Sequence, residues 1–66
     1  MNLACAEAFR YYARAVNSAA AAMKNGEDAY GMMVSALEKI TGFCEDLGLK
    51  DQAQKYQRLL SMLTDG

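Results

Sequence analysis

Residues 3–23 read LACAEAFRYYARAVNSAAAAM and carry the clearest structural pattern in the chain. Its larger apolar residues recur at alternating intervals of four and three residues, the spacing of a helix that packs lengthwise against other helices. The residues on this seam are Cys5, Phe9, Tyr12, Val16, Ala19 and Met23. Alanines flank the seam on both sides and polar residues fill only a narrow stripe, so we expect this helix to have neighbours on more than one side.

The composition favours helices throughout the chain. The 66 residues include no proline, and alanine and other strong helix formers supply most of the sequence. Two valines and one isoleucine leave little material for strands. A chain this short buries only about 60% of the surface that its unfolded form exposes, so it forms one small domain of marginal stability. The sequence therefore predicts a single all-α domain over residues 1–66.

Two turn signals divide the chain into three predicted helices, which span about residues 2–24, 27–47 and 50–63. Asn25-Gly26 and Gly48 can adopt the left-handed conformation that ends a helix, and Asn2 is a good N-cap. The predicted seam of the second helix contains Tyr30, Met33, Leu37, Ile40, Cys44 and Leu47. That of the third helix contains Leu49, Ala53, Tyr56, Leu60 and Leu63.

The first two seams match each other as an antiparallel hairpin. Residues that face each other in such a hairpin have numbers with a constant sum, and here every sum is 49. The pairs are Cys5 with Cys44, Phe9 with Ile40, Tyr12 with Leu37, Val16 with Met33, and Ala19 with Tyr30. The third helix continues these layers and places Tyr56 beside Phe9. We therefore predict an antiparallel up-down-up three-helix bundle with crossing angles of about 20°.

Two glycines interrupt the second predicted helix away from its seam. Gly31 and Gly42 each cost about 1 kcal/mol relative to alanine in a helix interior. They are either tolerated surface glycines, or positions where another backbone approaches closely, for example from a second subunit. A local break of the helix at Gly42 is a third interpretation.

The two cysteines allow two interpretations. The predicted hairpin places Cys5 and Cys44 in one layer, where a disulfide is geometrically possible. Such a bond would close a loop of roughly 40 residues and stabilise the fold by roughly 3–5 kcal/mol in the chain-entropy model. In a cytosolic protein, two reduced cysteines that act as small core hydrophobes are the favoured alternative.

No pattern in the sequence points to catalysis. Histidine is absent, which argues against a zinc site and against histidine-activated nucleophiles. The adjacent acidic pairs Glu27-Asp28 and Glu45-Asp46 point in different directions on a helix, and there is no glycine-rich phosphate loop. We therefore expect no catalytic residues, metal, cofactor or small-molecule substrate.

Charge and hydropathy argue against two further classes of partner. The net charge of −1 gives no electrostatic case for nucleic acid or an anionic membrane. The longest apolar run, residues 19–23, is far shorter than the roughly 20 residues that span a bilayer. The first residues do not have a basic segment followed by an apolar core, so we expect a cytoplasmic protein.

More apolar residues are present than a three-helix core can bury. Exposed apolar surface with aromatic and methionine side chains is typical of protein interfaces. The predicted partner-binding residues are Ala8, Tyr11, Ala15, Ala22, Met32, Phe43, Leu59 and Met62. The sequence thus favours a small interaction module, such as an adaptor, chaperone, inhibitor or oligomerisation domain, whose partner is another protein or a second copy in a homodimer. The alternatives are a structural subunit of a larger helical assembly and, less favoured by charge, a nucleic-acid-linked regulator.

Overall fold

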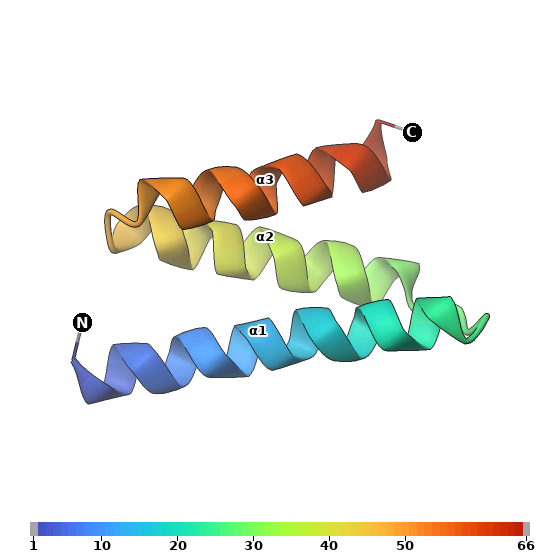
Figure 1. Ribbon diagram of the computed structural model, residues 1–66, viewed down its shortest axis with the longest axis horizontal. Helices are drawn as coiled ribbons and strands as arrows, with labels where there is room; N and C mark the ends of the chain where they lie inside the picture. The colour runs from blue at the N-terminus through green and yellow to red at the C-terminus, as the bar shows by residue number, and fades with distance from the viewer. Residues whose placement is uncertain (1, 66) are drawn as a thin grey trace.

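The computed structural model describes residues 2–65, which form three helices joined by two short connections (Figure 1). Helix α1 spans Leu3–Lys24, α2 spans Tyr30–Asp46, and α3 spans Lys50–Thr64. Consecutive helices run in opposite directions, which confirms the predicted all-α, up-down-up three-helix bundle.

The central helix of the bundle is α2. It packs against both α1 and α3, whereas in the described chain no Cα atom of α1 comes within 8 Å of a Cα atom of α3. Figure 1 shows α1 and α3 on either side of α2, which lies farther from the viewer. The molecule is accordingly flat, with extents of 37 × 22 × 14 Å. Side chains still bridge the outer helices, because the rings of Phe9 and Tyr56 meet edge to face at 6.5 Å, as the predicted layers require.

Both ends of α1 form as the sequence predicts. The side chain of Asn2 accepts a hydrogen bond from the backbone N–H of Cys5 at 2.8 Å and caps the first turn. At the other end Gly26 has a φ of +83°, which favours glycine. The N–H of Glu27 then donates to the carbonyl oxygen of Ala22 at 2.9 Å, so the chain closes α1 with a Schellman-type turn.

The second helix begins at Tyr30, three residues later than predicted. The N–H of Glu27 is bonded back to α1, and that of Ala29 donates to the carbonyl oxygen of Glu27 at 3.0 Å. Glu27 and Asp28 therefore lie in the connection and not in the first turn of a helix. Helix α2 ends at Asp46, one residue early, and α3 ends at Thr64, one residue late.

The core lies along the inner side of α2. Leu37, Ile40 and Cys44 are its largest fully buried side chains. The buried cluster contains Val16, Ala19, Met33, Ala36, Leu37, Ile40, Cys44, Ala53 and Tyr56. Most of these residues are on the predicted seams, so periodicity identifies the core. Among residues 2–65, no helix is long and apolar enough to cross a membrane.

One predicted seam residue behaves differently. Tyr30 is 45% exposed, and its hydroxyl donates to the carbonyl oxygen of Leu63 at 2.9 Å. Because α2 begins at Tyr30, this side chain lies at the end of the bundle, where it ties the start of α2 to the last turn of α3.

The core contains one polar defect that a substitution can test. The hydroxyl of Thr41 is buried and has no hydrogen-bond partner among the described residues. Such a group carries a desolvation penalty of about 1–3 kcal/mol. We expect Thr41→Val, which keeps the shape, to raise the free energy of unfolding by about 1 kcal/mol, measured by urea denaturation. Thr64→Val is the control, since the Thr64 hydroxyl is exposed and bonded to Leu60; equal or lower stability of Thr41→Val would contradict the assignment.

Candidate interaction surface

Tyr11 is the centre of the most exposed aromatic surface. Its side chain is 70% exposed, yet its ring meets that of Tyr12 edge to face at 5.6 Å. Tyr12 in turn meets Phe43 of α2 at 5.7 Å. The three rings form a row that runs from solvent into the junction of α1 and α2, so Tyr11 is supported from one side while it remains accessible.

The helical spacing shows which way this row faces. Phe9 contacts Tyr56 and therefore faces α3. Tyr11 follows two residues later, which corresponds to about 200° around the helix axis. Tyr11 therefore lies on the side of α1 that faces away from α3.

Six of the eight predicted partner-binding residues share the surface around Tyr11. Ala8, Ala15 and Ala22 are half-buried beside α2, and Phe43 is half-buried against Tyr12. Met32 is 55% exposed and lies eleven residues before Phe43, three full turns away on the same side of α2. We call this surface the α1/α2 face. It comprises Ala8, Tyr11, Ala15, Ala22, Met32 and Phe43.

The other two predicted residues lie elsewhere. Leu59 and Met62 belong to α3, which packs on the other side of α2 from α1. Leu59 is half-buried against the core, and Met62 is 68% exposed. The structure thus divides the predicted contact surface into the α1/α2 face and a separate site on α3.

Sequence reasoning missed two exposed apolar residues. Leu3 is 72% exposed in the first turn of α1, and Tyr30 was assigned to the core seam. Both lie at helix ends, where heptad spacing alone does not show that no neighbouring helix extends far enough to cover them.

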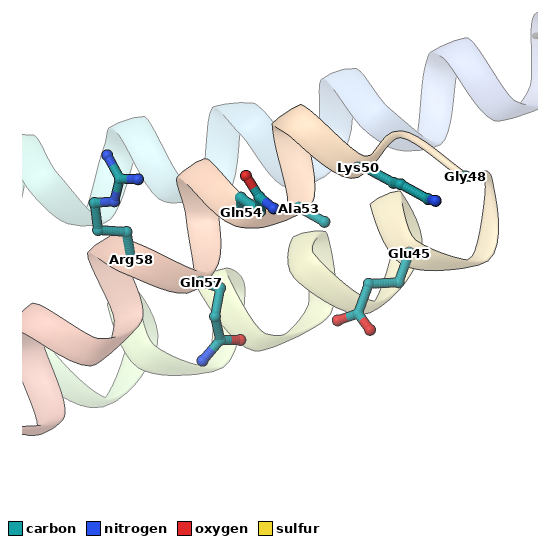
Figure 2. Close-up of a pocket in the computed structure, with 7 residues that line it drawn as sticks. All are labelled: Glu45, Gly48, Lys50, Ala53, Gln54, Gln57 and Arg58. Atoms are coloured by element: carbon teal, nitrogen blue, oxygen red, sulfur yellow. The ribbon is translucent and has the colours of Figure 1, made fainter.

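A shallow depression lies between α2 and α3 (Figure 2). Only Ala53 at its base is buried. Figure 2 shows Arg58 and Glu45 at opposite ends, with Lys50 extending toward the turn at Gly48, so charged groups do not converge on one point. The lining residues are Glu45, Gly48, Lys50, Ala53, Gln54, Gln57 and Arg58. Sequence reasoning did not identify this depression.

Two ionisable groups in the core have altered acidity. Burial raises the pKa of the Cys44 thiol. Burial, and secondarily the nearby Cys44, raise the pKa of Tyr56. Both groups are therefore neutral near pH 7 and act as core packing. Within residues 2–65 there is no cluster of three or more His, Cys, Asp or Glu residues that could hold a metal ion.

No protein-family model, curated protein or solved structure matches the chain.

The two cysteines are free thiols in different environments. Cys44 is fully buried, whereas Cys5 is half-buried in the first turns of α1. We expect Cys5 to react with a thiol reagent such as Ellman's reagent at least about tenfold faster than Cys44. The reagent attacks only an accessible thiolate, and Cys44 is fully buried. Cys5→Ser should leave only the slow phase. Fewer than two titratable thiols per unfolded, non-reduced chain would show that the alternative disulfide forms.

The two raised pKa values predict a loss of stability in base. The ordinary pKa values of Cys44 and Tyr56 are 9.0 and 10.0, and both are higher in the folded chain. The unfolded chain therefore loses these protons first as the pH rises, so stability that is present below pH 9 declines above it. Thermal melts followed by circular dichroism from pH 8 to 11 test this. Tyr56→Phe should flatten the decline, and an unchanged decline in this variant would contradict the assignment.

Proposed function

We propose that this protein is a small, non-catalytic helical module that binds another protein through the α1/α2 face. The observation that carries the proposal is the exposure of Tyr11, held by Tyr12 and Phe43 at the junction of two helices. Tyrosine is enriched at interface hot spots because it offers a large contact area and loses little conformational freedom.

The rest of the α1/α2 face suits a helical partner. Ala8, Ala15 and Ala22 are small, so a partner backbone can approach α1 closely along one side. Met32 supplies a flexible apolar side chain that adapts to the surface it meets. Leu59 and Met62 are not required by this proposal, since they lie on α3.

Adaptors, chaperones, inhibitors and oligomerisation domains all operate through such a face, and the proposal covers this class. We place the protein in the cytoplasm, where Cys5 and Cys44 remain reduced.

Site-specific photo-crosslinking in cells that make the protein tests the proposal. A benzophenone amino acid replaces Tyr11 in one variant and Gln52, an exposed residue at the start of α3, in a matched variant. We expect discrete protein adducts from position 11 and none from position 52, because only the first lies on the α1/α2 face. The adducts are read by mass on a denaturing gel, and a copy of the chain itself counts as a partner.

The absence of any adduct from position 11, in a variant that folds as judged by circular dichroism, would contradict the proposed function. Equal adducts from positions 11 and 52 would also contradict it, since they would indicate non-specific contact.

A further inference from the structure

Two glycines in α2 have no explanation within the chain. Gly31 and Gly42 lie on exposed positions, and a Cβ atom added at either would meet nothing within 4 Å in the described chain. Each glycine nevertheless costs about 1 kcal/mol relative to alanine in a helix. They are eleven residues apart, which is three turns, so they share one side of α2. A row of small residues at this spacing permits close approach of another helix.

The exposed side of α2 and the exposed side of α1 face the same way. Phe9 meets Tyr56, and Cys44 lies with Tyr56 in the buried core cluster. Tyr11 lies two residues after Phe9, and Gly42 lies two residues before Cys44. A separation of two residues places a side chain about 160° away around the helix axis. Both therefore face away from α3, on the same broad side of the molecule.

The net charges of the two helices are opposite in sign. Helix α1 carries Arg10, Arg14 and Lys24 against Glu7, whereas α2 carries Glu38, Glu45 and Asp46 against Lys39. Arg14 is two residues from Tyr12, which faces α2, so Arg14 faces away from α2. Glu38 is five residues from Phe43, about 140° around the helix, and faces away from α1. Arg14 and Glu38 are both exposed, and they cannot pair within one chain.

We propose that the partner of the α1/α2 face is a second copy of this chain, arranged so that α1 of each copy packs on α2 of the other. The proposal rests on the proposed function and names its partner. The twofold axis then runs parallel to the helices, and the four central helices form a bundle in which every neighbour is antiparallel.

The register of this dimer follows from the predicted hairpin pairs, in which Tyr12 faces Leu37. An axis parallel to the helices leaves the level of each residue along the bundle unchanged. Arg14 lies two residues past Tyr12, and Glu38 lies one residue past Leu37 on an antiparallel helix, so their levels differ by three residues, about 4.5 Å. Arg14 of one copy therefore reaches Glu38 of the other.

The same register brings Tyr11 over the glycine of the second copy. Tyr11 precedes Tyr12 by one residue and Gly42 follows Leu37 by five, so their levels differ by four residues, about 6 Å, with Gly42 on the side of the α1 N-terminus, toward which the Tyr11 side chain leans. The large ring thus meets the position that has no side chain. The dimer accounts for the exposure of Tyr11 and for the glycine at position 42 with one contact.

The net charges of the helices also distinguish this dimer from a dimer with the other orientation of the twofold axis. A twofold axis perpendicular to the helices would place α1 on α1 and α2 on α2. That arrangement brings two net positive helices together and two net negative helices together. Like charges at such distances oppose association, so the pairing of α1 with α2 is favoured.

The area of the α1/α2 face determines how strongly we expect two copies to associate. Helix α2 has 17 residues and is about 25 Å long, and two helices side by side are about 20 Å wide, which gives about 500 Å² per copy. The total of about 1,000 Å² is at the lower limit for a specific interface. We therefore expect a dissociation constant in the micromolar range or weaker.

Sedimentation of the purified 7.2 kDa chain from about 10 to 1,000 μM is the first test. We expect the mass to rise toward twice the monomer value with concentration. Tyr11→Glu should weaken association at least about tenfold, because Tyr11 is central to the interface. Met62→Glu is the matched control, since Met62 is equally exposed but on α3, and it should leave association unchanged.

Charge reversal tests the arrangement of the helices. Arg14→Glu and Glu38→Lys should each weaken association several-fold, because the symmetric dimer contains two such pairs of about 0.2–1 kcal/mol each. The double variant, Arg14→Glu with Glu38→Lys, should restore association. Rescue can arise only between chains, since the two residues face apart within one chain. No rescue would overturn the proposed arrangement.

Gly42→Ala separates the dimer from ordinary effects on stability. In dilute monomer it should raise the melting temperature, because alanine favours a helix and meets no atom within 4 Å. In the same variant the dimer should weaken several-fold, because the added methyl group lies under Tyr11 of the other copy. Unchanged or stronger association would overturn the proposal.

The dimer and the proposed function fail in different ways. A wild-type chain that stays monomeric up to 1,000 μM overturns the dimer. If position 11 still gives adducts with another protein in cells, the proposed function stands with a different partner. If it gives none, both are wrong.

Discussion

The structure depends on the burial of one side of α2. Leu37, Ile40 and Cys44 on this helix are the largest fully buried side chains, and both other helices pack against it. Burial of a Leu or Ile side chain is worth about 1.5–3 kcal/mol, a large share of the stability that a chain of 66 residues can have. Because α2 serves as the common neighbour, α1 and α3 need not approach each other. The bundle is flat for this reason, and one side of α1 stays uncovered.

Much of this architecture could be predicted from periodicity. The seams identify the core because the intervals of four and three residues record which side of each helix is apolar. The contact between Phe9 and Tyr56 follows from the same register. The start of α2 could not be predicted as well, because Glu27 is an acceptable first-turn residue by composition, and only the backbone hydrogen bond to Ala22 shows that it belongs to the turn.

The exposure of single residues on the candidate surface could be predicted from the sequence, but the way in which these residues group in space could not. Helical spacing shows that Tyr11 and Leu59 lie beside their seams, yet it does not show whether the two flanks meet. That depends on which pairs of helices are neighbours and on the side to which the third helix folds. Phe43 illustrates the same limit, because it is off the seam of α2 and is nevertheless half-buried against Tyr12.

Helix α2 also carries the features that cost the chain stability. The hydroxyl of Thr41 is buried without a partner, and Gly31 and Gly42 weaken the helix at positions where alanine would fit. A small domain has little stability in reserve, so three such features on its central helix weaken the element that holds the other two. The glycines lie outside the core, so packing within one chain does not require them. A second helix laid along that side would stabilise α2 by mass action and would make folding and association depend on each other through the same helix.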